Sequence, residues 1–255
     1  MPLPHFPSSI FNFPSLLLLL ASTAFAADLP SIPSNPIAKK KTLLFSDDFH
    51  ASAPDNRWHN FIETFALENG ALKGSQTRDK GIPATDGKPA ILPHAAVHAL
   101  ELPTKDSVIE VRIRFAGASM IEVELADTAD TGAHSGHICR AMVRLDSITI
   151  LDDREGGMRT DIYEMNKDPA RKAEVAKLLI GRSATYPAKL EPGKSYTLTL
   201  ETVGDTLRVT LDGKPAAFLQ SPGIGHPTKS TIYLGVAGKD AFFESVKVWS
   251  ADPAS

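Results

Sequence analysis

Apolar residues recur at every second position through the last quarter of the chain, and this pattern constrains the fold most. A two-residue period places alternate side chains on one face, which is typical of half-buried β-strands. Gly204-Asp205 and Asp212-Gly213 provide turn residues between the runs. These features predict an antiparallel all-β module. The alternating runs are 196–200, 207–211, 232–236 and 242–249.

Earlier segments extend the same pattern. Asn69-Gly70 lies between two alternating runs within 65–74, and Asn-Gly is a strong hairpin signal. A second hairpin is predicted over 140–151, with its turn at Asp146-Ser147. Segments 108–115 and 121–125 also alternate, and they are predicted to form two adjacent strands.

One helix is predicted, over 168–181. Asp168 is a suitable N-cap, a proline follows it, and Gly181 suits the C-terminal end. The apolar stripe of this helix, which includes Val175, is expected to pack on the strands. Together with about ten to twelve short strands, the prediction is a sandwich of two antiparallel sheets with one inserted α-helix.

Composition excludes some partners and suggests one domain. Of the 255 residues, 42% are hydrophobic and 22% are charged, and the net charge is −3. The only basic run is 39–41, so the electrostatic footprint of a nucleic-acid-binding protein is missing. We expect a single domain over 43–250 with its first and last strands as neighbours. Residues 27–42, rich in Pro, Ser and Lys, are predicted to be a disordered linker, and 251–255 a tail.

The N-terminus predicts export. Residues 15–26 form an apolar core of signal-peptide length that ends in the cleavage pattern Ala24-Phe25-Ala26. Removal of 1–26 would leave no membrane span and would place the protein in the periplasm or outside the cell. A retained anchor is the alternative, although the run is too short to span a bilayer. Cys139 is the single cysteine, so the fold is expected to depend on its core and not on a disulfide.

Three segments carry a resemblance to known proteins. They are 44–49 (LFSDDF), 190–214 (with LEPGKSY and LDGK) and 243–249 (FESVKVW). Together they resemble the concanavalin A-like jelly rolls. Within these, the chain is similar to secreted bacterial proteins of the 3-keto-disaccharide hydrolase domain family over about residues 43–250.

The resemblance implies a two-sheet sandwich whose concave face meets a sugar. It also implies cleavage of disaccharides that are oxidised at C3. A ketone at C3 acidifies the proton on C2, so a positioned base can remove that proton and expel the substituent on C1. A metal or a cationic donor would stabilise the enolate.

The best candidate site in the sequence is 127–140. It contains Asp127, His134, His137 and Arg140 within a loop and the beginning of the next strand. The His-x-x-His pair with nearby aspartates could bind a divalent metal. Alternatively, His137 could act as a base while Arg140 holds an oxyanion or a sugar hydroxyl. A flexible polar loop without a ligand is the third interpretation.

A second candidate is Glu122-x-Glu124-x-x-Asp127. It resembles the E-x-D-x-x-E strand motif of family 16 glycoside hydrolases, with the acid types permuted. Alternate carboxylates on one strand face could provide the two groups that glycoside hydrolysis needs. The simpler expectation is that Glu122 and Glu124 face solvent and pair with Arg112 or Arg114 across the strands.

Other polar groups receive structural interpretations. His94 and His98 are predicted to be surface or capping histidines and not ligands. Residues 152–157 have the composition of a Ca²⁺ loop, but they are better explained as a tight turn. His226 lies in a long connection between strands and could reach the cleft.

The sequence therefore predicts an exported jelly roll that engages carbohydrate. One hypothesis is an enzyme that cleaves 3-keto-glycosides, and the other is a non-catalytic module that binds glycan or cell-surface material. A divalent metal and the oligomeric state are left open. The residues assigned to catalysis are His137, Arg140, Asp127 and Glu122, and those assigned to substrate binding are His134, Glu124 and His226.

Overall fold

The computed structural model describes residues 29–51, 53–62, 65–85, 87–88 and 90–254. The predicted signal peptide, 1–26, lies outside the described residues. No helix within the described part of the chain is long and apolar enough to cross a membrane. The strands are β1 (Ala38–Asp47), β2 (Trp58–Ile62), β3 (Phe65–Glu68), β4 (Ala71–Ser75), β5 (Ala96–Thr104), β6 (Ser107–Ala126), β7 (His137–Val143), β8 (Ser147–Asp152), β9 (Ser183–Pro187), β10 (Ser195–Val203), β11 (Thr206–Leu211), β12 (Lys214–Gln220) and β13 (Lys229–Pro253).

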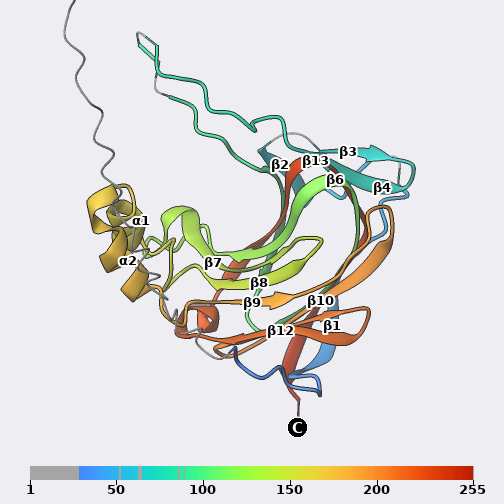
Figure 1. The fold of residues 1–255 in the computed structure, drawn as a ribbon. Coiled ribbons are helices and arrows are strands. Elements are labelled where there is room, and N and C mark those ends of the chain that lie inside the picture. The colour runs from blue at the N-terminus through green and yellow to red at the C-terminus, as the bar shows by residue number, and fades with distance from the viewer. Residues whose placement is uncertain (1–28, 52, 63–64, 86, 89, 255) are drawn as a thin grey trace, which may run out of the picture.

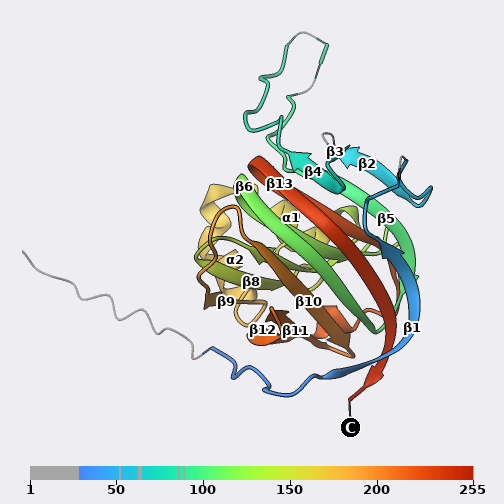
Figure 2. The same ribbon diagram turned by 90° about the vertical axis from the view of Figure 1, so that its right-hand side faces the viewer.

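Two long strands organise the fold. β6 and β13 pair with each other along most of their length, and they bend together, as Figures 1 and 2 show. The first half of β6 pairs with β10, and the second half pairs with β7. Hydrogen bonds thus join thirteen strands into one antiparallel sheet that folds over itself into two layers.

Each layer takes one half of the long strands. The β7 layer has the order β9-β8-β7-β6-β13-β5-β2, and the β10 layer has the order β12-β11-β10-β6-β13-β1. The hairpin of β3 and β4 joins β13 next to the bend. This arrangement confirms the predicted antiparallel all-β sandwich.

Glycines allow the bend. Gly117 in β6 has φ 115° and Gly238 in β13 has φ 87°, and the pairing of the two strands shifts register there. A Cβ atom on Gly238 would lie 2.8 Å from the backbone nitrogen of Ser119. Bulges with glycine at positive φ bend strands without a steric clash. The two glycines therefore let β6 and β13 each pass from one layer into the other.

This bend corrects two sequence predictions. Segments 108–115 and 121–125 are not two adjacent strands, because both belong to β6. Likewise, 232–236 and 242–249 both belong to β13. The alternation of apolar residues was correctly identified. It is interrupted at the bulge, and in a sequence such an interruption cannot be distinguished from a turn between two strands.

The core lies between the two layers. Val111 and Ile113 face inward from the β10 layer, and Ile121 and Val123 face inward from the β7 layer; all four are fully buried. Residues on the neighbouring strands complete the same cluster. The predicted Asn-Gly hairpin is confirmed, since Asn69 and Gly70 connect β3 to β4 with positive φ at both positions.

The segment before β1 is ordered, contrary to prediction. Arg208 donates hydrogen bonds to the carbonyl oxygens of Pro33 and Ser34 at 2.9 and 3.2 Å, and Glu201 accepts one from the backbone of Ile37. Arg208 and Glu201 are themselves a buried ion pair at 2.8 Å. Composition predicted a linker over 27–42, and the described part of it is instead held by backbone contacts to this pair.

The predicted tail is also wrong in part. Ala251 and Pro253 belong to β13 and pair with Lys40 and Ala38 of β1. The domain boundaries of 43 and 250 are therefore too narrow at both ends. The expectation that the first and last strands are neighbours is confirmed.

Two short helices follow β8, where one was predicted. Asp168 caps a turn of 3-10 helix through the backbone of Ala170, as expected, and α2 (Lys172–Leu178) follows. The additional helix is α1 (Thr160–Met165). Figure 1 shows both at one end of the sandwich. Val175 is buried, but Ile180 beyond α2 is largely exposed, so only part of the apolar stripe packs.

Candidate functional site

The candidate site lies on the outer face of the β7 layer. Alternate residues of β6 point inward into the core, so Glu122 and Glu124 point to the opposite face. Glu124 pairs in register with Arg140 of β7 and Tyr233 of β13. Glu122 pairs with Gly235 of β13. Neighbouring strands thus place the acids next to a cation and an aromatic ring.

The two glutamates do not face solvent, so that prediction was wrong. Glu122 is 5% exposed and Glu124 is 2% exposed. Arg112 and Arg114, the predicted partners, instead bind Glu244 at 2.7 and 3.0 Å. The reason is the bend of β6, which puts the arginines in the β10 layer and the glutamates in the β7 layer.

Arg140 is the cation at the centre of the site. Its Nη1 lies 3.3 Å from Glu124 and 3.5 Å from Glu122, and its Nε donates to Asp153 at 2.6 Å. Its Nη2 is buried and has no hydrogen-bond partner among the described residues. A buried donor without a partner is costly, so Nη2 is a candidate group for a substrate oxygen.

His137 is bound to Glu124. Its Nδ1 forms a hydrogen bond with one carboxylate oxygen of Glu124, and the other oxygen faces Arg140. An ionised carboxylate only accepts hydrogen bonds, so Nδ1 carries a proton, and in the neutral ring Nε2 then has a free electron pair. This carboxylate–histidine pair is the usual arrangement of a general base.

Burial and charge separate the pKa values of the acids. Burial raises the pKa of Glu122, and the charge of Arg140 offsets only part of that effect. Burial acts on Glu124 as well, but the Arg140 charge and the His137 hydrogen bond outweigh it and lower its pKa. Burial also raises the pKa of Asp153. Two neighbouring carboxyl groups with separated pKa values suit an acid and a base role.

The pKa of His137 is raised. Burial lowers it, but the hydrogen bond and the charge of Glu124 outweigh burial; Arg140 acts to lower the pKa and Asp153 to raise it. The imidazolium form is thus stabilised by the carboxylate next to it.

A pocket of about 120 Å³ opens above these groups. Phe61 and Tyr233 form its aromatic wall, and their ring centroids are 5.5 Å apart. His134 and His94 line it as well, and His134 stacks on Tyr163 of α1 at 3.7 Å. The helical insertion therefore borders the pocket through His134.

Asp127 and His226 lie away from this pocket. Asp127 accepts hydrogen bonds from Thr228 and from the backbone of Ala129, and it lies 3.2 Å from Nε2 of His226. Neither residue lines the pocket of Glu122 and Glu124. The third position of the motif that resembles family 16 is thus separated from the first two, because the chain leaves β6 after Ala126.

Sequence reasoning did not assign four residues to the site. Asp153 was assigned to a tight turn, Phe61 was not considered, and Tyr233 was one of several aromatics that the sequence could not separate from core residues. His94, predicted to be a surface or capping residue, lines the pocket. The clearest available signal was Asp153, since it directly follows β8, and β8 pairs with the strand that carries Arg140.

His98 belongs to the core and not to the surface, as had been predicted. It is stacked between Trp58 and Phe65, with ring centroids 5.0 Å away on each side, and its Nδ1 bonds Asn60 at 2.8 Å. Burial lowers its pKa to about 4. His98 is therefore neutral and structural at physiological pH.

The donors for a metal do not converge. Among the residues that the structure describes, no group of three or more His, Cys, Asp or Glu side chains is placed to hold a metal ion. The rings of His134 and His137 are 6.3 Å apart, and Nδ1 of His137 is bound to Glu124. We therefore derive no step through a metal.

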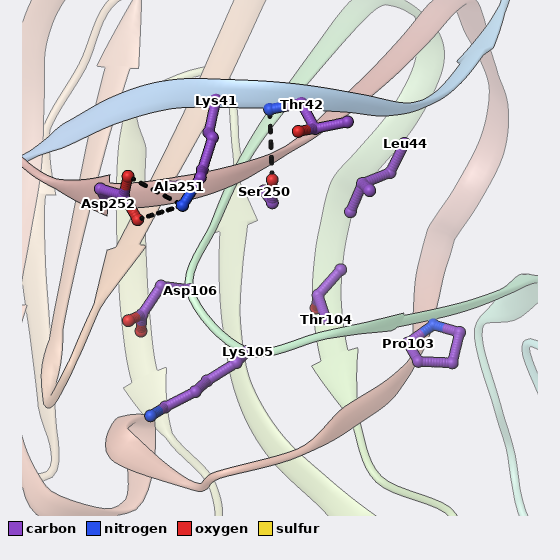
Figure 3. A pocket seen from close by; sticks show the side chains of 10 residues that line it. All are labelled: Lys41, Thr42, Leu44, Pro103, Thr104, Lys105, Asp106, Ser250, Ala251 and Asp252. Atoms are coloured by element: carbon purple, nitrogen blue, oxygen red, sulfur yellow. Dashed lines mark hydrogen bonds and ion pairs between the residues drawn. The ribbon is translucent and has the colours of Figure 1, made fainter.

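A larger hollow of about 580 Å³ lies at the edge of β1 and β13 (Figure 3). Lys41 pairs with Asp252 at 3.2 Å there, and the backbone of Thr42 donates to Ser250. The remaining carboxylate, Asp106, accepts a backbone hydrogen bond at the β10–β11 turn. Asp106 and Asp252 both have structural partners here, so this hollow is a weaker candidate for a catalytic site than the pocket of Glu122 and Glu124.

Comparison with solved structures identifies the fold. The laminarinase catalytic domain from Thermotoga maritima has a TM-score of 0.55 at 13% identity, over 83% of this chain and 99% of that chain. The endo-β-1,3-glucanase from Pyrococcus furiosus has a TM-score of 0.54 at 11% identity, over 86% and 100%. Porphyranase B from Zobellia galactanivorans has a TM-score of 0.53 at 11% identity, over 82% and 92%.

These likenesses confirm the predicted concanavalin A-like jelly roll. No protein-family model matches the chain, and the search of curated proteins found no match. Membership of the 3-keto-disaccharide hydrolase domain family thus stays a prediction.

Proposed function

We propose that the protein is exported, acts on carbohydrate and cleaves glycosides whose sugar is oxidised at C3. The observation that carries this proposal is the bond of His137 to Glu124 next to Arg140, in a pocket walled by Phe61 and Tyr233. A base, a cation and an aromatic surface share one face of the sheet. The laminarinase, glucanase and porphyranase of similar fold are named for carbohydrate substrates, which supports the choice of substrate class.

His137 begins the reaction. Its free Nε2 removes the proton from C2 of the 3-keto sugar, and the electron pair of that bond forms the C2–C3 double bond of an enolate. The negative charge develops on the C3 oxygen. Arg140 meets this charge, because its Nη2 has no partner among the described residues and its guanidinium is held in place by contacts with Glu122, Glu124 and Asp153.

Glu122 completes the cleavage. The enolate regenerates the C3 ketone, a C1–C2 double bond forms, and the bond from C1 to the leaving oxygen breaks. Glu122 donates a proton to that oxygen, since burial raises its pKa and thus favours its protonated form. Addition of water across the new double bond then gives net hydrolysis, and proton transfer through water from His137 to Glu122 restores both groups.

Direct hydrolysis by two carboxylates is less well supported. One oxygen of Glu124 is bound to His137 and the other faces Arg140, so neither is free to attack a sugar carbon. Asp127 lies outside the pocket, so it cannot replace the acid of a family 16 site. The elimination route needs only one base, one acid and one cation, all of which are present.

A non-catalytic glycan-binding module is the second candidate. Phe61 is 55% exposed next to Tyr233, and exposed aromatic faces of this kind stack on sugar rings. This candidate needs no turnover, and it predicts binding that survives the loss of His137.

The test is product analysis by mass spectrometry in D₂O, with matched native and 3-keto disaccharides and with and without chelator. We expect cleavage of the 3-keto sugars only, deuterium at C2 of the product, and loss of turnover in His137→Ala. His226→Ala, which changes a histidine outside the pocket, should keep full activity. Absence of turnover with either set of sugars would reject the enzyme and favour the binding module.

A further inference from the structure

A second histidine lines the pocket that contains His137. The imidazole ring of His134 borders the same pocket, and its centroid lies 6.3 Å from that of His137. His134 is exposed to solvent, whereas His137 is only partly exposed. No described residue forms a hydrogen bond or an ion pair with a ring nitrogen of His134. One nitrogen of the neutral ring is therefore free to accept a proton.

The helical insertion after β8 fixes the position of His134. Its backbone nitrogen donates to the carbonyl oxygen of Met158 at 2.6 Å, and its ring stacks on Tyr163 of α1 with an interplanar angle of 8°. Gly136, two residues later, has φ 70°, and a Cβ atom there would collide with the carbonyl oxygen of Asp127. Glycine is thus needed for the tight turn between His134 and β7. Packing and backbone geometry together orient this ring.

The two histidines differ in their electrostatic surroundings. Burial lowers the pKa of His134, and the charges of His137 and Lys167 lower it further, whereas Glu164 acts in the opposite direction. The pKa of His137 is raised, because its bond to Glu124 outweighs burial. The neutral ring is therefore favoured at His134 and the imidazolium at His137. Neighbouring groups with separated pKa values suit two different proton transfers.

The proposed cleavage requires a base for water after the elimination. At that stage His137 holds the proton from C2, so it cannot accept another from water. Glu122 has released its proton, but it is only 5% exposed and lies against Gly235, below the position of the sugar. His134 is the group in this pocket that is both neutral and open to solvent.

We propose that His134 is the base that hydrates the unsaturated sugar. The inference rests on the proposed function, because this sugar is the product of the elimination. A ring nitrogen of His134 removes a proton from water, the hydroxide adds to C1, and the electron pair of the C1–C2 double bond forms the C2–C3 enolate. A second water molecule protonates C2 and restores the C3 ketone. The hydroxide left from that step takes the proton back from His134, so one water molecule is added in total.

The test supplies the 1,2-unsaturated 3-keto-glucose directly to the full protein. Its conjugated enone absorbs ultraviolet light, and hydration removes this absorption. After subtraction of the rate in buffer, we expect hydration by the wild type and a fall of about a hundredfold in His134→Ala and in His134→Gln, whose side chains have no basic nitrogen. Tyr163→Ala should lose about tenfold through misorientation of the ring, and Tyr163→Phe should restore the rate. His50→Ala is the control, since His50 is an exposed histidine outside the pocket.

A second measurement uses the 3-keto disaccharide. In His134→Ala the ratio of unsaturated to hydrated product should rise about a hundredfold, whereas a misfolded variant would lose both products together. Hydration that persists in His134→Ala, or that is lost only in Glu122→Gln, would overturn the inference, as would a wild type that leaves the supplied sugar unchanged. Hydration that depends on His134 in a protein that cleaves no 3-keto disaccharide would support the inference and reject the elimination, so the two proposals can fail separately.

Discussion

His137 forms its hydrogen bond through Nδ1 to Glu124, a residue thirteen positions earlier on the neighbouring strand. The contact is produced by the pairing of β6 with β7, which brings the beginning of one strand next to the end of the other. It favours the tautomer of His137 that carries its proton on Nδ1, and it raises the pKa of this histidine. The predictions below depend on that contact and on the charges around it.

The first prediction concerns pH. His137 acts as a base only when it is neutral, so kcat/KM should rise with pH through its raised pKa. Glu124→Gln removes the anion that stabilises the imidazolium, so the pKa of His137 falls and the acid limb moves to lower pH. Arg140 and Asp153, the other charged groups at the ring, stay in place. NMR titration of His137 checks the shift, and an unchanged acid limb would contradict the assigned base.

The second prediction concerns Glu122→Gln. A carboxyl group whose pKa is raised in the folded state contributes stability below its unfolded pKa, and this contribution is lost as pH rises through the folded pKa. Glutamine does not ionise, so the variant does not lose this stability as the pH rises. The variant should therefore be more stable than the wild type at neutral pH, by on the order of 1 kcal/mol, with the difference disappearing near pH 4. Denaturant unfolding at several pH values measures this.

Activity of the same variant tests the acid role. Glutamine cannot donate a proton to the leaving oxygen, so disaccharide cleavage should fall by about a hundredfold or more. A 3-keto-glucoside with a nitrophenolate leaving group needs no proton and should keep most of its rate. If both substrates lose activity equally, Glu122 is not the acid.

The third prediction concerns Arg140→Lys. One ammonium group cannot replace the contacts that the guanidinium makes with Glu122, Glu124 and Asp153. Buried carboxylates that lose their partner are destabilising, so unfolding free energy should fall by about 3 kcal/mol. Arg112→Lys is the control, since this arginine forms an exposed pair and should change stability by less than about 0.5 kcal/mol. Equal losses of stability in Arg140→Lys and Arg112→Lys would contradict a buried ion-pair cluster around Arg140.

The fourth prediction concerns Gly235→Ala. A Cβ atom at this position would lie 2.4 Å from both Cγ and Oε1 of Glu122, so the acid must move. We expect a loss of about 1 to 3 kcal/mol in stability, together with reduced turnover. Gly157→Ala is the control, because a Cβ there meets no atom within 4 Å. Thermal unfolding and kcat of the two variants provide the comparison, and a neutral Gly235→Ala would mean that the space next to Glu122 is not needed.

The sequence alone was sufficient for the all-β class and for local turns. Alternation at 207–211 and the Asn69-Gly70 pair depend on nearest neighbours, and each produced the expected strand or hairpin. Local patterns report local geometry, so these predictions hold without knowledge of the partners. The same reasoning failed for the described part of the predicted linker, 29–42, where Arg208 holds Pro33 from more than 160 positions away in the sequence.

The site depended more on tertiary structure. His137, Arg140 and the two glutamates could be selected from residue types, but their burial and mutual contacts follow from strand register, which a sequence pattern does not show. Register also separated Asp127 from the glutamates that precede it.

The sequence by itself thus determined which segments alternate, where hairpins turn and which residue types gather near 122–140. Only the tertiary structure decided that β6 bends at Gly117, that Glu122 and Glu124 become buried, and that Phe61 joins Tyr233 above them. The physical reason is the range of the interactions. Alternation and turn preference act between neighbours along the chain, whereas burial and pKa depend on groups that strand pairing brings together from distant positions.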